Sequence, residues 1–286
     1  MRTIRAFGLA SFLIFAFGAR AEQQCPAFSG EWCNGGPYTI EGLKGKAVLI
    51  YLFEAKCPNC AGKWPAINQI PKTFENDPTV LIAVCPGNTK AAVDAYVKAN
   101  KVTWPVMADS SRVFEKQLIE MKLISQEISL QNIMQVCVVN ADDEIDFGNW
   151  NDFAGSLRHV LNTAKWKIDP ATIPETLKKA WRAVEFNQMS VAAPLIAQAL
   201  KSADAKTKEA AQSLQAVVQP ALAAAKEKEQ AVNQVKIDRA PTYVLTDGSR
   251  VKALSVIDAD DTVVIKTADG KIMTVQKTDI KEIIKP

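Results

Sequence analysis

The sequence is poor in histidine, in long apolar runs and in net charge, and each shortage excludes a class of function. Its 286 residues include one histidine, His159. A zinc site built from paired cysteines and histidines is therefore not expected. The apolar run near the start, "AFGLASFLIFAFG", has about 13 residues. A membrane-spanning helix needs roughly 20, so we expect no stable membrane insertion.

Residues 1–21 are typical of a secretory signal peptide. Arg2 and Arg5 give a positive start, the apolar run follows, and Ala19-Arg20-Ala21 fits a small-x-small cleavage site. Cleavage there removes three arginines and no acidic residue, so the formal net charge falls from +3 to 0. The mature chain has no basic excess of the kind that binds nucleic acid. We expect a periplasmic or secreted protein without a nucleic-acid partner.

All six cysteines lie in the part that would be exported: Cys25, Cys33, Cys57, Cys60, Cys85 and Cys137. Disulfides persist outside the cytoplasm. Cys25 and Cys33 bracket "PAFSGEW", whose glycine and proline allow a turn. A local disulfide between these two cysteines is therefore plausible, and it would tie down a weak N-terminal segment.

Residues 44 to about 165 alternate between strand and helix patterns. Continuous apolar runs predict strands at 46–53, 79–85 and 133–140, with a shorter fourth strand in "IDFGNW". Helical patterns begin at about residue 58 and cover 88–100, 110–121 and 152–165. Such alternation predicts an α/β fold, in which a parallel or mixed sheet carries helices on both faces.

The C-terminal third changes character twice. Residues 170–236 are rich in Ala, Lys, Gln and Glu with helical periodicity, which predicts a helical hairpin. Residues 238–286 contain short β-branched runs separated by Asp-Gly turns at 247–248 and 269–270. This pattern is similar to a small SH3-like β-barrel. The expected domains are therefore 1–21 (signal), 22–168 (α/β), 170–236 (helical) and 238–286 (barrel).

Cys57 and Cys60 form a C-x-x-C motif that follows a predicted buried strand and opens a helix. A thiolate at a helix N-terminus is stabilised by unpaired N–H groups and the helix dipole, and Lys56 adds a neighbouring positive charge. We expect Cys57 to be the exposed attacking thiol and Cys60 the buried resolving thiol. A metal site lacks a second ligand pair, and two merely packed thiols are the remaining alternative.

Two segments resemble a known family. "VLIYLFEAKCPNCAGKWPAI" is similar to the active-site segment of the thioredoxin superfamily, and "VTWPVMADSSRVFEK" resembles a segment of its redoxin-like, often periplasmic, branch. The resemblance covers about residues 40–165, and Pro65 matches the helix-kinking proline of the family. It implies a thioredoxin-like mixed sheet of four or five strands flanked by helices. It also implies protein thiols or disulfides as substrates and no cofactor.

The chain departs from the family pattern around the motif. Lys56 stands where the family usually has tryptophan, and Tyr51 occupies the strand position of a buried acid. Lys63 replaces an acid found after the second cysteine in related proteins. Met134 or a neighbour stands where the family places a cis-proline that holds the substrate backbone. Glu54 is either a displaced proton acceptor or a solvated surface acid.

Three further side chains carry weaker expectations. Cys85 ends a predicted strand on the same edge as Cys57 and Cys60, so it is either a third redox thiol or a core residue. Cys137 lies in the middle of a strand, which favours an inert core thiol. We expect His159 to be a surface or packing residue.

Three functions remain open. The first is an exported thiol–disulfide oxidoreductase that uses Cys57 and Cys60. The second is a redoxin-type peroxidase, which needs a threonine at position 54, where this chain has Glu54. The third is a non-enzymatic binding or scaffold protein that retains a thioredoxin fold.

Overall fold

The computed structural model describes residues 23–285. The predicted signal peptide, residues 1–21, lies outside the described residues. The chain divides into two compact units. The first comprises the residues up to Pro170 together with Glu185–Gln188, and the second comprises Ala171–Val184 and the residues from Met189 onward. The predicted domain boundaries stay predictions.

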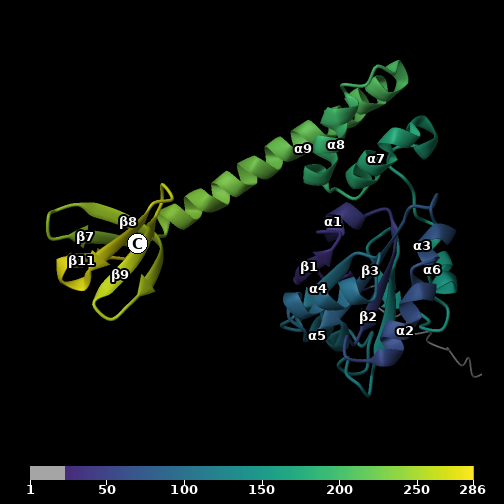
Figure 1. Cartoon of the computed structure of the whole chain (residues 1–286), viewed down its shortest axis with the longest axis horizontal. Coiled ribbons are helices and arrows are strands. Elements are labelled where there is room, and N and C mark those ends of the chain that lie inside the picture. Colours follow the sequence, from purple (N-terminus) through teal and green to yellow (C-terminus); the bar gives the residue numbers. More distant parts are fainter. Residues whose placement is uncertain (1–22, 286) are drawn as a thin grey trace, which may run out of the picture. The chain divides into compact units, whose positions relative to one another are not determined.

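The first unit is built on a six-stranded mixed sheet in the order β1-β4-β3-β2-β5-β6 (Figure 1). The strands are β1 Glu31–Asn34, β2 Ala47–Phe53, β3 Thr79–Pro86, β4 Val106–Asp109, β5 Met134–Val139 and β6 Ile145–Phe147. Strands β2, β3 and β4 are parallel, whereas β1, β5 and β6 run antiparallel to their neighbours. The predicted α/β fold with a mixed sheet is confirmed, and β1 and β4 are additional short strands.

The helices of this unit cover both faces of the sheet. They are α1 Ile40–Leu43, α2 Pro58–Ile67, α3 Ile70–Thr73, α4 Lys90–Ala99, α5 Val113–Glu120 and α6 Phe153–Leu161. Successive side chains of β2 point to opposite faces. The face of Tyr51 packs against α2, α4 and α6 and forms what we call the first core. The face of Ile50 packs against α1 and α5 and forms the second core.

A buried ion pair joins the start of β2 to residues 185–188. Lys46 Nζ lies 2.7 Å from Glu185 Oε2, and both side chains are inaccessible to solvent. Lys46 Nζ also donates to the Lys165 carbonyl at 2.9 Å. The Glu185 carboxylate accepts backbone N–H groups from Lys167 and Ile168. Every charge in this cluster therefore has a partner, which a buried ion pair requires.

The second unit begins with helices. Two 3-10 turns, Pro170–Thr172 and Glu175–Leu177, precede α7 Lys178–Glu185, α8 Met189–Ala199 and α9 Ala205–Asp238. The Asp204 side chain caps α9 by accepting the Thr207 N–H at 2.9 Å. Helix α8 packs against α9, whose buried residues all lie in its N-terminal half. The helical hairpin stays a prediction.

The C-terminal residues form a five-stranded antiparallel sheet in the order β10-β9-β8-β7-β11. The strands are β7 Thr242–Leu245, β8 Arg250–Asp258, β9 Thr262–Thr267, β10 Ile272–Gln276 and β11 Ile280–Ile284. Gly248 and Gly270 have φ values of 86° and 84°, so the Asp-Gly turns use the left-handed region that glycine permits. The outer strands β10 and β11 do not pair in this order, so a closed SH3-like barrel is not confirmed.

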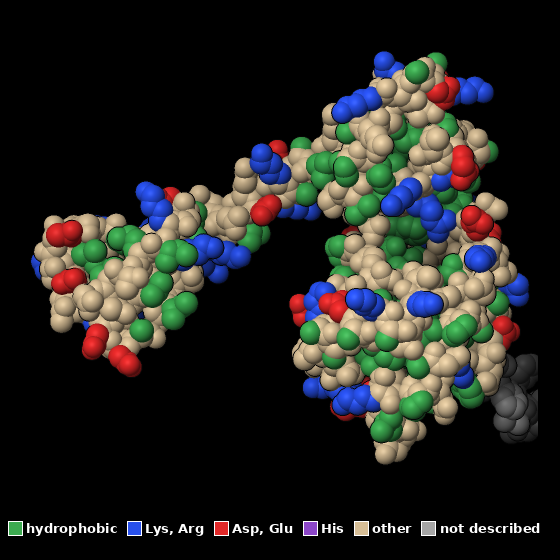
Figure 2. Space-filling model, viewed as in Figure 1, with side chains coloured by type: hydrophobic (Ala, Val, Ile, Leu, Met, Phe, Trp, Pro, Cys, Tyr) green, Lys and Arg blue, Asp and Glu red, His purple; other side chains and the backbone are tan. Residues whose placement is uncertain are grey.

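The surface carries both signs of charge. Figure 2 shows Lys and Arg side chains interspersed with Asp and Glu on the visible face. Within residues 23–285, every helix is too short or too polar to cross a bilayer.

Candidate active site

The C-x-x-C motif lies where β2 ends and α2 begins. Cys57 is the N-cap of α2 with extended φ and ψ of −88° and 114°, and Pro58 takes the first helical position. The Cys57 carbonyl accepts the N–H groups of Cys60 at 3.1 Å and Ala61 at 3.3 Å, which closes the first turn. Both cysteines are free thiols. Their predicted place at a helix N-terminus therefore agrees with the structure.

The expectation that Cys57 is exposed is wrong. Cys57 is only 5% exposed and Cys60 is fully buried, and both belong to the first core. The reason is that the turn after Phe53 brings the N-cap side chain against the sheet rather than away from it. A substrate sulfur therefore has access to a small part of the Cys57 surface.

Cys60 faces the loop before β5. Its Sγ donates to the Ile133 carbonyl at 3.4 Å, and the same oxygen accepts the Glu54 N–H at 3.1 Å. Burial, and after it the neighbouring Cys57, raise the pKa of the Cys60 thiol to about 11, although the Glu54 backbone and the Tyr51 hydroxyl act in the opposite direction. Cys60 is therefore held as a neutral thiol at neutral pH.

Aromatic side chains enclose the two thiols. The Trp64 ring on α2 meets the Tyr51 ring edge to face at 5.7 Å, and its Nε1–H donates to the Tyr96 hydroxyl at 2.9 Å. The Tyr51 hydroxyl is buried and makes no hydrogen bond within residues 23–285. Burial raises the pKa of Tyr96 to about 12 and raises that of Tyr51 further. The sequence identified Tyr51 only as a departure from the family pattern and did not identify Tyr96.

Met134, which with its neighbours is predicted to stand where the family has a cis-proline, lies next to the loop that contacts Cys60. It is the first residue of β5, is paired with Phe53, and follows the Ile133 carbonyl that contacts Cys60. The Lys63 ammonium lies 3.6 Å from the Met134 sulfur and stacks over the Trp150 ring. The loop thus contacts Cys60 through the Ile133 carbonyl, and the replacement of the family's cis-proline by Met134 stays a prediction.

The remaining predicted site residues differ in their surroundings. Glu54 is 6% exposed, and its Oε1 accepts the Lys56 N–H at 2.9 Å. Interpreting Glu54 as a solvated surface acid is therefore wrong. Its carboxylate is buried and accepts a backbone hydrogen bond within the turn between β2 and α2. The Lys56 side chain is exposed. Pro65 lies inside α2, as predicted.

Cys85 and Cys137 flank β2 on its two neighbouring strands, as expected. Cys85 belongs to the first core, accepts a hydrogen bond from the Asn88 amide at 3.5 Å, and has its pKa raised by burial to about 12. Cys137 is fully buried in the second core, and burial raises its pKa to about 12. The Cys137 thiol therefore lies on the face opposite to Cys57 and Cys60.

The predicted Cys25–Cys33 disulfide is absent, because both residues are free thiols. Cys25 packs in the second core, and Cys33 packs against the first core. The segment between them passes from one face of the sheet to the other, which separates the two sulfurs. The turn that the sequence allows therefore does not bring them together.

An ion pair between Arg112 and Glu115, at the start of α5, was not predicted. Arg112 has a positive φ of 57°, and its Nη1 lies 2.6 Å from Glu115 Oε2. It also donates to the Ile128 carbonyl at 3.3 Å. The Glu115 side chain is fully buried. The guanidinium thus pairs with this carboxylate and also lies 3.7 Å from Glu127 Oε2, and no local sequence pattern indicates either pairing.

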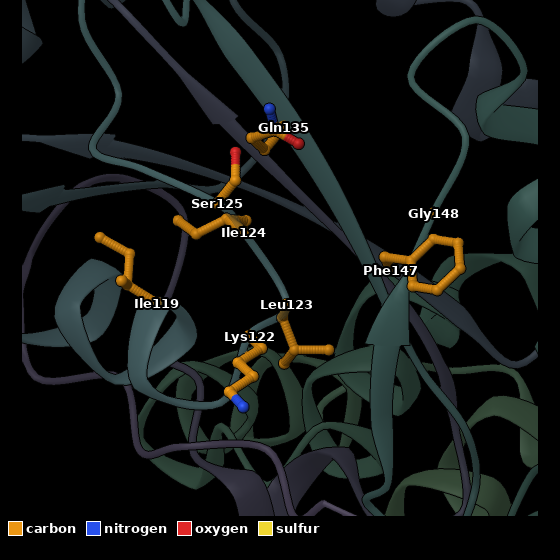
Figure 3. A pocket seen from close by; sticks show the side chains of 8 residues that line it. All are labelled: Ile119, Lys122, Leu123, Ile124, Ser125, Gln135, Phe147 and Gly148. Carbon is orange, nitrogen blue, oxygen red and sulfur yellow. The ribbon is translucent and has the colours of Figure 1, made fainter. Parts of the chain in front are cut away.

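A pocket of about 460 Å³ lies beside β5 and β6, and its lining includes Leu123 and Ile124 of the second core (Figure 3). Gln135, next to Met134, lines one part of it, and Phe147 and Lys122 line others. His159 is exposed, as predicted, and lines a second pocket of about 730 Å³. Within residues 23–285, no group of three or more His, Cys, Asp or Glu side chains is arranged to hold a metal ion.

Part of this chain is similar to known proteins. The AhpC/TSA family model matches residues 21–150. The chain is 31% identical over 87 residues to thiol-disulfide oxidoreductase ResA of Bacillus subtilis, a match that covers 30% of this chain and 49% of that protein. Sporulation thiol-disulfide oxidoreductase A of the same organism is 27% identical over 112 residues, which cover 36% of this chain and 66% of that protein.

One solved structure is similar to part of this chain. The thiol:disulfide interchange protein of the thioredoxin family from Chlorobium tepidum TLS is 23% identical, with a TM-score of 0.39. The match covers 49% of this chain and 97% of that chain. The chain spans about half the length of ResA, the first of the curated relatives, at 49%.

Proposed function

We propose that this chain is an exported thiol–disulfide oxidoreductase acting on protein thiols. The match of residues 21–150 to the AhpC/TSA family model and the similarity to ResA support this proposal. The main observation behind this proposal is the pair of thiols at the start of α2. Cys57 caps the helix, and Cys60 lies one turn further on with its thiol neutral and buried. The proposed reaction needs no metal or cofactor.

The chemistry proceeds in two exchanges. The Cys57 thiolate attacks a substrate disulfide, forms a Cys57–substrate disulfide and releases the other substrate sulfur as a thiolate, which takes a proton from water. Cys60 then loses its proton, and the resulting thiolate attacks the Cys57 sulfur while the departing substrate sulfur takes up a proton. This second step forms the Cys57–Cys60 disulfide and releases the remaining substrate sulfur. Two electrons have passed from the dithiol to the substrate, and the reverse sequence oxidises a substrate dithiol.

The location and domain plan belong to the same proposal. The signal-like residues 1–21 and the six cysteines support a periplasmic or secreted protein. The strand order β11-β7-β8-β9-β10 and the two Asp-Gly turns support an SH3-like barrel for residues 238–286. The packing of α8 on α9 supports a helical hairpin in residues 170–236.

Insulin reduction by the mature chain, residues 22–286, tests the proposal. We expect Cys57→Ser to abolish the activity because no attacking sulfur remains. Cys137→Ala is the matched control, since it removes a buried thiol from the opposite face of the sheet. The proposal fails when Cys57→Ser reduces insulin as fast as the unaltered chain.

The same samples separate the alternatives. Peroxide consumption that depends on Cys57 indicates a redoxin-type peroxidase, against which the Glu54 at the threonine position argues. A stable Cys57–Cys60 disulfide without either activity indicates a binding or scaffold protein. The 5% exposure of Cys57 is the observation that favours this second candidate.

A further inference from the structure

The Tyr51 hydroxyl is a buried polar group without a partner. Tyr51 lies in the middle of β2, is fully buried, and its hydroxyl makes no hydrogen bond within the described part of the chain. Most buried hydroxyl groups are hydrogen-bonded, and an unpaired one destabilises the fold. Phenylalanine would keep the ring contacts without this cost, so the presence of the oxygen calls for an explanation.

The hydroxyl lies beside the resolving thiol. The Tyr51 ring packs edge to face on Trp64. Cys60 lies four residues before Trp64 on α2, so the two side chains share one face of the helix. Cys60 and Tyr51 belong to the same core, and each alters the ionisation of the other. After burial, Cys60 is the group that contributes most to raising the pKa of Tyr51, and the hydroxyl in turn lowers the pKa of Cys60.

The existing contact of Cys60 suits only its neutral form. Its S–H donates to the Ile133 carbonyl. Once the proton is lost, the thiolate has nothing to donate, and a carbonyl cannot donate to it. The α2 N–H groups at positions 60 and 61 are already directed to the Cys57 carbonyl. The Glu54 N–H lowers the pKa of Cys60 more than the Tyr51 hydroxyl does, but this N–H already donates to the Ile133 carbonyl. Within the described residues, the Tyr51 hydroxyl is a side-chain donor in this core that has no other partner.

We propose that the Tyr51 hydroxyl is the hydrogen-bond donor that stabilises the Cys60 thiolate while it attacks the Cys57 mixed disulfide. The proposal rests on the proposed thiol–disulfide exchange. Cys60 loses its proton, its electron pair forms the bond to Cys57, and the departing substrate thiolate takes up a proton. Tyr51 keeps its own proton throughout, because burial raises its pKa.

Other titratable groups face Cys60, and they provide the control. They are Cys57 at the start of α2 and Tyr96 on α4. The Tyr96 hydroxyl is engaged with Trp64 Nε1–H at 2.9 Å. Tyr96→Phe therefore removes a phenol oxygen near the same core but keeps the Tyr51 hydroxyl, which is the proposed donor. Tyr51→Phe removes only the unpaired oxygen and keeps the ring.

The test follows release of the coloured thiol from one equivalent of 5,5′-dithiobis(2-nitrobenzoate) by the reduced full mature chain. Cys33 is replaced by serine in all samples, because it is only partly buried. The first phase reports attack by Cys57, and the second reports resolution by Cys60. We expect Tyr51→Phe to slow the second phase by a factor of roughly ten to a hundred, to shift its pH profile upward, and to leave the first phase unchanged. Tyr96→Phe should leave both rates within threefold.

The two proposals fail differently. A first phase that persists in Cys57→Ser contradicts the proposed function. A normal first phase with a second phase unchanged in Tyr51→Phe, at every pH, overturns the role of Tyr51 alone. A hydroxyl with a purely structural role gives the same result, together with a Tyr51→Phe chain that is more resistant to urea.

Discussion

The two faces of the central sheet are built from alternate residues of the same strands, yet they hold different groups. The first core contains Cys57, Cys60 and Cys85 beside the Tyr51 phenol. The second core contains Cys25 and Cys137 among aliphatic and aromatic side chains. Burial raises thiol pKa values on both faces. A raised pKa therefore does not distinguish a redox thiol, whereas a second sulfur one turn away at a helix N-terminus does.

The buried ion pair beside the second core gives the largest expected effect. Lys46→Met leaves Glu185 charged in a site without solvent, which should lower the free energy of unfolding by about 3–5 kcal/mol. Urea denaturation measures this. Lys90→Met, which breaks the exposed Lys90–Asp94 pair, is the control and should change stability little. A Lys46→Met chain as stable as the unaltered protein contradicts the prediction.

The pH dependence of stability gives the next largest effect. Burial raises the pKa of Cys137 from its ordinary 9.0 to about 12 in the folded protein. Between about pH 9 and 12, the unfolded chain loses a proton that the folded chain keeps, so stability falls as pH rises. The slope is about 1.4 kcal/mol per pH unit for each such thiol.

Cys137→Ala isolates one thiol in this titration. Urea denaturation of the reduced protein at several pH values should show a shallower decline for Cys137→Ala than for the unaltered chain, by the contribution of one proton. For Cys60 in the first core, the pH range in which its thiol lowers stability ends at a lower value, about pH 11. Identical slopes with and without Cys137 would show that its thiol does not remain protonated in the folded state.

The smallest effect concerns packing alone. Cys137→Ala removes one buried sulfur and should lower the free energy of unfolding by about 1 kcal/mol, with insulin reduction unchanged. Cys85→Ala is the matched change on the first face and should cost a similar amount of stability. If both variants reduce insulin as fast as the unaltered chain, Cys57 and Cys60 are sufficient for the reaction. A loss in Cys85→Ala alone assigns the redox role to three thiols.

The strands that carry the site were predictable because their signal is local and strong. The apolar runs at 46–53, 79–85 and 133–140 correspond to β2, β3 and β5. Strands β1 and β4 were missed, since each has four residues and little periodicity. Their place in the sheet comes from pairing with each other and with β3.

The site was predictable in position but not in detail. The motif spacing placed Cys57 and Cys60 at the start of α2, which depends on local chain geometry. The burial of Cys57 and Glu54, and the free hydroxyl of Tyr51, depend on how α2 and the Ile133 loop pack on the sheet. Such contacts join residues more than seventy positions apart, as Cys60 and Ile133 are. No local pattern encodes them.

Residues 185–188 belong to the first unit, so this unit cannot be isolated by a single cut after residue 170 without losing part of its structure. Truncation at residue 170 would remove Glu185 and leave the Lys46 ammonium without its carboxylate partner in a site that solvent does not reach. It would also remove the Phe186 ring from its neighbours Tyr38 and Trp166. A fragment intended to fold as the first unit, whether made in the laboratory or by gene rearrangement, must therefore include residues 185–188.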